Sequence, residues 1–238
     1  MDRTRWIIFS VICVAVLGSL VLFSRRDEVD VSKVEPAKAI SETETAIGDH
    51  IYGDKSSPVV LIEYGDFQCP ACGSAFPQIQ TIKKTYGDKI AFIFRNYPLT
   101  TIHPNALAAS TTAEAAGLQG KFWEMHDQLY ANQQAWSDVD ASKRTDSFVG
   151  FAKDIGLDTA KFREDLKDPK VNAKITRDRS LGDKLKVQST PSVYLGDTSL
   201  SQDEITDLVQ QKGTKLMDKL DAALKAADIE PPQRPADS

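Results

Sequence analysis

Two short apolar runs on either side of a predicted helix constrain the fold most strongly. Residues 59–62 are Val-Val-Leu-Ile, as a strand buried on both faces requires, and residues 90–94 form a second apolar run. Between them, a helix is predicted from Cys69 to Gly87, with one apolar face made by Phe76, Ile79 and Ile82. A strand, a helix and a strand of these lengths form a parallel β-α-β crossover. The chain is therefore expected to be of the α/β class.

Helical signals dominate the next part of the chain. Apolar stripes at helical spacing recur between residues 104 and 186, with Pro104 and Pro169 suited to first helical positions and Asp158 suited to a cap. This stretch has no second cysteine pair and no glycine-rich phosphate loop. We expect a block of consecutive helices with a structural role.

The domain is predicted to close with strands and a helix. Residues 192–195 form a short strand, and Gly196-Asp197 forms the turn to a second one. Ser201 and Glu204 have the spacing of a capping box at the start of a final helix. Together these signals predict one domain over residues 46–228.

Cysteine content and net charge exclude two classes of protein. The only cysteines are Cys13, Cys69 and Cys72, too few for a small domain held together by disulfides. The formal net charge of −5 gives no basic footprint of the kind that nucleic acids require. Because Cys13 lies in an apolar N-terminal run, the folded domain has a single cysteine pair.

The N-terminal run, Trp6 to Phe23, has 18 residues without a charge. This length is at the lower end of what crosses a bilayer as a helix. The alternative is a cleaved signal peptide, but residues 23–26 (Phe-Ser-Arg-Arg) lack the small residues of a cleavage site. We therefore predict an uncleaved N-terminal transmembrane helix over residues 1–24. Arginines flank both ends of the run, so charge does not predict its orientation.

Two segments are expected to lack regular structure. Residues 25–45 are rich in acids and have no apolar periodicity, which predicts an acidic, flexible tether between the membrane and the domain. Residues 229–238 contain three prolines and are expected to be a disordered tail.

The Cys69-Pro70-Ala71-Cys72 sequence permits either half of a zinc site or a redox pair. A structural zinc ion needs about four ligands. There is no second cysteine pair, and His50, His103 and His126 are far apart in sequence, with His103 and His126 expected to be structural. No metal is therefore expected, and the redox interpretation is favoured.

The position of the pair supports redox chemistry. Cys69 is expected at a helix N-terminus, where free amide N–H groups and the helix dipole stabilise a thiolate. Pro70 fits the first turn because it lacks an N–H. The thiol pKa of Cys69 is expected to fall to roughly 3.5–7.5, as in related motifs. Cys72, one turn further on, is expected to be the less exposed, resolving thiol.

Two other positions have two interpretations each. Pro191, after Thr190 and before the strand at residues 192–195, is either an ordinary strand-start proline or a cis-proline in a tight turn. Glu63 lies within an apolar strand. It either faces solvent, or it is buried with a raised pKa and relays protons for the resolving thiol.

At these residues the sequence resembles the DsbA-like branch of the thioredoxin superfamily. The resemblance covers nearly all of residues 48–225, and the order and spacing of its motifs agree. The matching stretches are residues 58–72 (PVVLIEYGDFQCPAC), 95–104 (RNYPLTTIHP), 120–130 (GKFWEMHDQLY) and 189–194 (STPSVY).

The resemblance implies a thioredoxin fold with a helical insertion at about residues 104–186. It implies that Cys69 is the attacking cysteine and Cys72 the resolving one. It also makes Pro191 the cis-proline that faces the pair, with Thr190 before it, and Glu63 the family's buried acid. No cofactor is expected beyond the redox-active Cys69–Cys72 disulfide itself.

The expected activity is thiol–disulfide exchange in secreted or surface proteins, on the outer side of a membrane (periplasm or cell exterior). Ala71 departs from the family's strongest oxidants, which have a histidine between the cysteines. Thr190 also occurs in isomerase-like relatives. A reductase or isomerase of the same fold, or a copper or zinc chaperone that uses the pair, therefore remains an alternative.

The expected partners follow from this activity. They are cysteine-containing protein substrates and a membrane quinone-linked protein that reoxidises the pair. Contact with the membrane is expected through the N-terminal helix, and the protein is expected to be a monomer.

Overall fold

The computed structural model describes residues 12–13, 31–32, 34–36, 38–41 and 47–234. The chain divides into two units, residues 1–30 and 31–238, and the elements below belong to the second. The transmembrane helix expected over residues 1–24 lies outside the described residues, apart from Ile12 and Cys13. Within the described ranges, no helix is both long and apolar enough to cross a bilayer.

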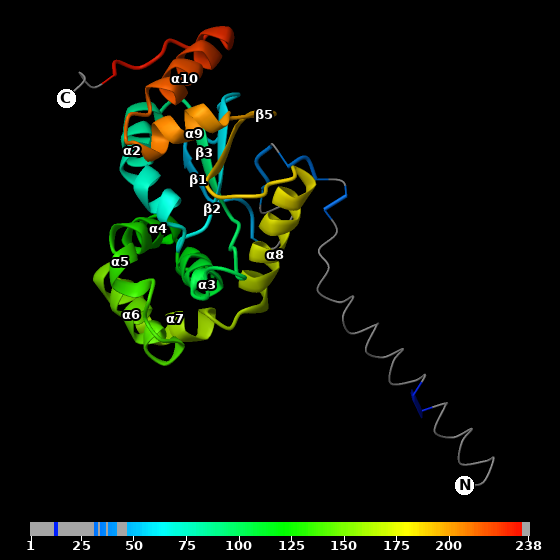
Figure 1. The fold of residues 1–238 in the computed structure, drawn as a ribbon, viewed down its shortest axis with the longest axis vertical. Coiled ribbons are helices and arrows are strands. Elements are labelled where there is room, and N and C mark those ends of the chain that lie inside the picture. Colours follow the sequence, from blue (N-terminus) through cyan, green and yellow to red (C-terminus); the bar gives the residue numbers. More distant parts are fainter. Residues whose placement is uncertain (1–11, 14–30, 33, 37, 42–46, 235–238) are drawn as a thin grey trace. The chain divides into compact units, whose positions relative to one another are not determined.

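A mixed sheet of five strands lies at the centre of the second unit (Figure 1). Its strands lie in the order β1-β3-β2-β4-β5. β2 and β3 are parallel, and every other neighbouring pair is antiparallel. The strands are β1 (Ile51–Gly53), β2 (Val60–Gly65), β3 (Ala91–Asn96), β4 (Ser192–Leu195) and β5 (Thr198–Ser199). The parallel pair is the crossover that the two apolar runs predict.

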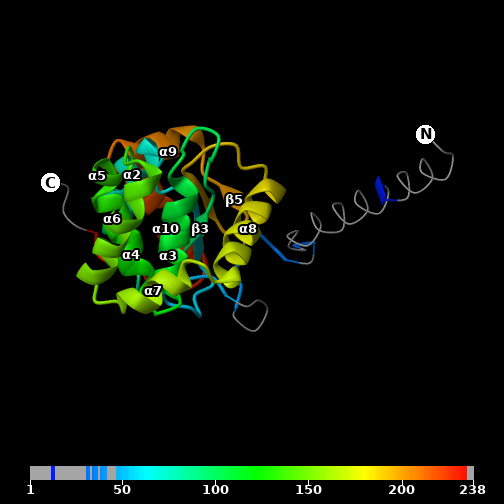
Figure 2. The same ribbon diagram turned by 90° about the horizontal axis from the view of Figure 1, so that it is seen from below.

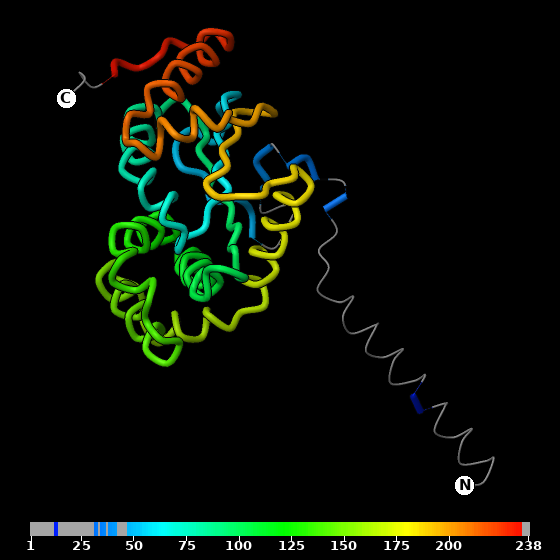
Figure 3. Tube along the Cα trace, in the orientation of Figure 1, coloured from blue at the N-terminus to red at the C-terminus, as the bar shows by residue number. Residues whose placement is uncertain are grey.

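Three helices pack on one face of the sheet: α2 (Pro70–Tyr86), α9 (Gln202–Val209) and α10 (Thr214–Ala226). Figure 3 follows the chain through this arrangement, with α9 and α10 in orange beside α2. Side chains alternate along each strand, so that Leu61, Phe92 and Val193 contribute to this layer. Glu63 is two residues after Leu61 and therefore points to the same side of the sheet as α2.

The opposite face is covered by α8 (Pro169–Lys184) and by residues that precede the sheet. Its core combines side chains from the sheet, from α8 and the residues after it, and from Ile40. These are Ile40, Ile62, Tyr64, Ile93, Tyr97, Leu181, Val187 and Tyr194.

Helices α3 to α7 form the body of the insertion, and α8 returns the chain to the sheet. Their bounds are α3 (Ala106–Gly117), α4 (Phe122–Ala131), α5 (Gln133–Trp136), α6 (Ala141–Asp154) and α7 (Thr159–Asp165). Figure 2 shows α3, α4, α6 and α7 gathered together, and these helices contact one another. Asp158 and Asp168 cap α7 and α8. The predicted insertion at about 104–186 agrees with these bounds, although the first helix begins at Ala106 and not at Pro104.

The end of the domain differs from the single final helix that the sequence predicts. The chain leaves α9 after Val209, and Gln211 and Gly213 both adopt positive φ, 60° and 63°, before α10 begins. Asp207 accepts the backbone N–H of Lys215 at 3.1 Å and so stabilises the break. The capping box of Ser201 and Glu204 is present as predicted.

Part of the predicted tether packs on the domain. Ile40 is 3% exposed, and Arg95 of β3 donates hydrogen bonds to the carbonyl oxygens of Pro36 and Lys38. The Arg95 guanidinium is itself paired with Asp49 at 2.7 Å. A buried cation on β3 therefore orders described residues of a segment whose own composition predicts disorder.

The predicted tail also makes contacts before the described residues end. Ile229 packs against the core between the sheet and α10. Arg234 donates to Asp221 at 2.6 Å and to Asp218 at 2.8 Å. Residues 229–234 therefore follow the surface of α10, although they form no helix or strand.

Candidate active site

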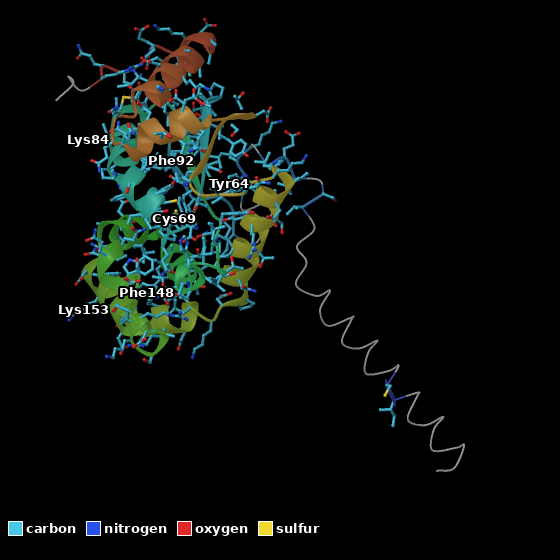
Figure 4. All side chains as sticks on the ribbon, in the orientation of Figure 1. Tyr64, Cys69, Lys84, Phe92, Phe148 and Lys153 are labelled. Carbon is cyan, nitrogen blue, oxygen red and sulfur yellow. The ribbon has the colours of Figure 1, made fainter. Side chains whose placement is uncertain are left out.

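Cys69 lies at the N-terminus of α2, next to the helical insertion (Figure 4). It is the N-cap residue, with an extended backbone (φ −67°, ψ 122°), and Pro70 occupies the first turn. The Cys69 N–H donates to the Asp66 carbonyl at 3.0 Å, which turns the chain from β2 into the helix. Cys69 is 7% exposed, so it is largely buried, in contrast to an outward-facing thiol, although it is less enclosed than Cys72.

The surroundings of Cys69 favour its thiolate. A hydrogen bond from the Cys72 thiol lowers the pKa of Cys69 to about 5, against the opposing effect of burial. Thr190 and the backbone N–H groups of Cys72 and Ala71 contribute in the same direction. These N–H groups are the free donors at the start of a helix, and they stabilise negative charge. The pKa agrees with the range expected from the sequence.

Cys72 has the opposite environment. It lies one turn into α2 and is 1% exposed. Burial raises the pKa of the Cys72 thiol well above its usual value, and the hydrogen bond to Cys69 and the charges of Cys69 and Glu63 add to this. Both cysteines are free thiols in the structure. One sulfur is thus easily ionised and slightly exposed, whereas the other is protonated and fully buried.

The Thr190–Pro191 peptide bond is cis, as the family resemblance implies. The Cys69 thiol donates to the Thr190 carbonyl oxygen across 3.3 Å. The Thr190 hydroxyl is buried and has no hydrogen-bond partner among the described residues. It is therefore available to a sulfur that ionises beside it.

Glu63 is buried beneath the pair rather than facing solvent. It is 3% exposed, and it lies opposite Val193 in the register of β2 and β4. Burial raises the pKa of Glu63 to about 7, the charge of Lys83 opposes this, and the charge of Cys69 adds to it. A carboxyl group with this pKa exchanges its proton near neutral pH.

Lys83 is a residue of this site that the sequence analysis missed. It lies on the last turn of α2 and is only 2% exposed. Its ammonium group is 3.2 Å from an oxygen of Asp127 on α4, and it lies over the rings of Tyr52 and Trp123. A lysine near the end of a helix is normally solvent-exposed, so only the fold reveals that Lys83 is buried.

The loop before α2 is held by Asp66. One oxygen of this fully buried carboxylate accepts the backbone N–H of Leu99 at 2.9 Å and lies 2.7 Å from the His103 ring. The other oxygen accepts the backbone N–H of Gln68 at 2.8 Å. His103 therefore contacts the loop through Asp66, and its structural role stays a prediction.

Gln133 fastens the same loop from the insertion. Its side-chain amide donates to the carbonyl oxygens of Phe67 at 2.8 Å and Cys69 at 2.9 Å. Gly73 makes room for it, since a Cβ there would lie 2.3 Å from the Gln133 side-chain oxygen. No sequence motif marks Gln133, because its role depends on how α5 packs against α2.

A pocket of about 1210 Å³ opens beside the N-terminus of α2. Pro70, Gly73 and Ser74 line it on the side of α2, and the insertion supplies many polar side chains. These include Asn105, Gln133, Gln134, Ser137 and Arg144. The surface next to Cys69 is therefore a polar recess.

Comparison with known proteins places these features in a family. The thioredoxin family model Thioredoxin_4 matches residues 45–212, which include both cysteines, Glu63 and the cis-proline. The chain belongs to the thioredoxin family. The match covers most of the chain and agrees with the fold implied by the resemblance to DsbA-like proteins.

Two solved structures similar to this thioredoxin-family protein come from Wolbachia pipientis and Bacillus subtilis. The thiol-disulfide exchange protein alpha-DsbA2 from Wolbachia pipientis has a TM-score of 0.62 and 24% identity, over 74% of this chain and 87% of that protein. BdbD from Bacillus subtilis has a TM-score of 0.57 and 22% identity, over 74% and 96% of the two chains. These likenesses establish the fold.

Curated relatives of this thioredoxin-family protein are named as Na(+)/H(+) antiporters. A Na(+)/H(+) antiporter NhaA 1 from Salinispora arenicola is 39% identical over 147 residues, 62% of this chain and 21% of the antiporter. One from Mycolicibacterium vanbaalenii is 34% identical over 151 residues, 62% of this chain and 23% of that protein. The chain thus spans about a fifth of the length of these relatives.

Proposed function

We propose that this chain is a thiol–disulfide oxidoreductase that acts on cysteine-containing proteins through Cys69 and Cys72. The observation that carries the proposal is the contrast between the two sulfurs. Cys69, at the helix N-terminus beside the Thr190 carbonyl, has a pKa lowered to about 5 chiefly by the Cys72 thiol, whereas burial raises the pKa of Cys72. A dithiol with one stabilised thiolate and one buried thiol suits directed disulfide exchange.

In the oxidising direction, the reaction begins with a Cys69–Cys72 disulfide. A substrate thiolate attacks the Cys69 sulfur, a substrate–Cys69 disulfide forms, and Cys72 leaves and takes up a proton. A second substrate thiolate then attacks the substrate sulfur of this mixed disulfide, and Cys69 leaves as a stable thiolate. The substrate gains one disulfide and loses two electrons, which reduce the cysteine pair.

Glu63 is proposed to supply and remove the proton of Cys72. The carboxyl group is buried on the α2 side of the sheet, and with burial raising its pKa to about 7 it is partly protonated at neutral pH. It therefore donates a proton when Cys72 leaves and accepts one when Cys72 attacks.

The low pKa of Cys69, due mainly to the hydrogen bond from Cys72, supports oxidation as the physiological direction. A stabilised thiolate stabilises the reduced form and so makes the disulfide a stronger oxidant. Reduction or isomerisation by the same fold is the main alternative, because Ala71 lies where the strongest oxidants of the family have a histidine.

The proposed location is outside the cytoplasm, with residues 1–24 as a membrane anchor. Disulfide formation requires an oxidising compartment, and the apolar run from Trp6 to Phe23 has the length of a short membrane span. Reoxidation of the pair would then require a quinone-linked protein in the same membrane.

The reduction potential of the full-length chain tests this function. A value near about −120 mV is expected of an oxidant, whereas about −270 mV would indicate a thioredoxin-like reductant. The oxidised chain should also restore activity to a reduced, unfolded substrate enzyme, and Cys69→Ser should abolish this. If the two sulfurs cannot form a disulfide, and the reduced chain instead retains copper or zinc, the metal-chaperone alternative replaces the proposal.

A further inference from the structure

The ammonium group of Lys83 lies in an enclosed site with two kinds of neighbour. The rings of Tyr52 and Trp123 have their centroids 4.7 Å and 4.4 Å from the nitrogen. Asp127 supplies a carboxylate oxygen at 3.2 Å. Contacts with two aromatic faces and one anion hold a lysine side chain in a fixed position.

Asp127 connects this enclosed cation to the surface of the insertion. It lies on α4, and its side chain is 41% exposed, whereas that of Lys83 is 2% exposed. The same Asp127 oxygen lies 2.8 Å from the ring of the buried His126. Burial would raise the pKa of Asp127, but the His126 hydrogen bond and the charges of His126 and Lys83 lower it, so the carboxylate stays ionised.

Lys83 also acts on Glu63, which is buried on the α2 side of the sheet. Burial raises the pKa of Glu63, and the charge of Lys83 is what opposes that increase. The other ionisable groups that interact with Glu63 are Cys69, Cys72 and, from α4, Tyr130. Those that interact with Lys83 are Asp127 and His126.

We propose that Asp127 is a positioning residue of the proposed exchange reaction, which fixes the Lys83 ammonium near Glu63 and so couples the helical insertion to proton transfer at Cys72. The inference rests on the oxidoreductase function proposed above. Burial lowers the pKa of Lys83, and Asp127 is the group that opposes this decrease most strongly. Without Asp127, the pKa of Lys83 is therefore expected to fall further. The Lys83 ammonium is then no longer held in place by Asp127, and its stabilising effect on the Glu63 carboxylate weakens.

The step affected is the resolution of a mixed disulfide. Cys72 gives its proton to the Glu63 carboxylate, its thiolate attacks the Cys69 sulfur, and the Cys69–Cys72 bond forms as the substrate thiolate leaves and is protonated by solvent. The rate increases with pH as Glu63 ionises. The midpoint of this pH dependence should therefore lie near pH 7, since burial raises the pKa of Glu63 to about that value.

The test compares full-length Asp127→Asn with the wild type in single-turnover resolution of a mixed disulfide between pH 5 and 9. Weakening of an opposite charge that acts on a buried carboxyl group moves its pKa by about 1 unit. The midpoint of the variant should therefore shift upward by about 1 pH unit, and its rate at pH 7 should fall about fivefold. Asp127→Glu should restore most of the wild-type profile.

Two further variants separate positioning from a general charge effect. Glu124→Gln removes one negative charge from the exposed side of the same helix, where Glu124 pairs with Lys121. It should leave the pH profile of the resolution rate unchanged. In a Lys83→Met background, Asp127→Asn should cause no additional shift. A midpoint that stays the same or moves down in Asp127→Asn, or an equal shift in Glu124→Gln, would overturn the proposal.

A direct titration keeps this inference separate from the proposed function. The ¹³C resonance of the Glu63 carboxyl group, measured in the reduced chain, should titrate at higher pH in Asp127→Asn than in the wild type. This reading needs no exchange activity. If the chain has no exchange activity but the resonance shifts, only the oxidoreductase function is refuted. If the chain is active but the resonance does not shift, only the role of Asp127 is refuted.

Discussion

The sulfur of Cys69 lies 3.3 Å from the carbonyl oxygen of Thr190, a residue 121 positions further along the chain. The first belongs to the start of α2 and the second to the turn before β4. The contact joins the two ends of the thioredoxin domain, with the helical insertion between them in sequence. The buried Thr190 side chain also acts on Cys69 and lowers its pKa.

Thr190→Val should raise the pKa of Cys69. The substitution keeps the backbone carbonyl and the side-chain shape but removes a hydroxyl that is able to donate to the thiolate. After the hydrogen bond from Cys72, Thr190 is the next group that lowers this pKa. The thiolate absorbance near 240 nm, followed against pH, should have its midpoint at about pH 5 in the wild type and higher in the variant. An unchanged midpoint would show that the hydroxyl does not reach the sulfur.

Glu63→Gln should stabilise the protein at high pH but not at low pH. Burial raises the folded-state pKa of Glu63 from 4.5 to about 7. Between these values the folded state binds more protons than the unfolded state, so wild-type stability falls as pH rises. The full free-energy cost of burying the ionised Glu63 carboxylate is present above pH 7 and absent below pH 4.5. It amounts to about 3 kcal/mol at most.

Urea denaturation of both proteins at pH 4.5 and pH 8 measures this difference. The titration of Cys69 largely cancels, because both proteins contain it. Equal stability differences at the two pH values would mean that Glu63 has an ordinary pKa in the folded state.

Arg95→Met should destabilise the fold by about 3 kcal/mol, the lower end of the cost of breaking a buried ion pair. Asp49 loses its closest cation, but Arg177 at 3.5 Å and Lys174 at 3.7 Å remain near it. The variant should also expose the backbone at Pro36 and Lys38 to limited proteolysis, because Arg95 donates to the carbonyl groups of both residues.

The matched control for Arg95→Met is Arg163→Met, which breaks an exposed pair between α7 and Asp146 of α6. An exposed pair contributes only about 0–1 kcal/mol. If the two variants lose equal stability, the buried ion pairs around Asp49 do not hold the backbone at Pro36 and Lys38 in place.

Gln133→Ala should loosen the loop that carries Cys69 while leaving the cysteines in place. Two hydrogen bonds, to Phe67 and Cys69, are lost. The free energy of unfolding should fall by about 1–3 kcal/mol. Hydrogen exchange of the Gly73 amide, which donates to the Cys69 carbonyl at 3.1 Å, should become faster. Gln134→Ala, at the exposed neighbouring position, should change neither quantity.

The sequence predicts the elements of this fold that carry local signals. The two apolar runs predict β2 and β3, the helix between them places Cys69 at its N-cap, and the caps at Asp158 and Ser201 begin helices as expected. Each of these signals depends only on neighbouring residues. β1 has just three residues and pairs with β3 in the antiparallel direction, so it has no comparable signal.

The remaining features depend on residues that are distant in sequence. Lys83 and Asp127 lie on different helices, and neither residue type indicates burial until α2 and α4 pack together. The segment around Ile40 has the composition of a tether, but Arg95, far along the chain, supplies the donors that order it. Whether Glu63 is buried could likewise not be decided from strand alternation, because its strand is covered on both faces.

The register of β2 and β4 has a consequence for how the protein is made. Glu63 lies opposite Val193, and Thr190 immediately precedes this paired segment. A slip of one residue would move the Thr190 carbonyl by about 3.3 Å and turn alternate side chains to the other side of the sheet. While the chain is being synthesised, Cys69 and Cys72 emerge long before the segment that completes their surroundings. Until that strand pairs, the nascent polypeptide carries a CxxC pair without the Thr190 contact, so the surroundings that lower the pKa of Cys69 are complete only when the sheet closes.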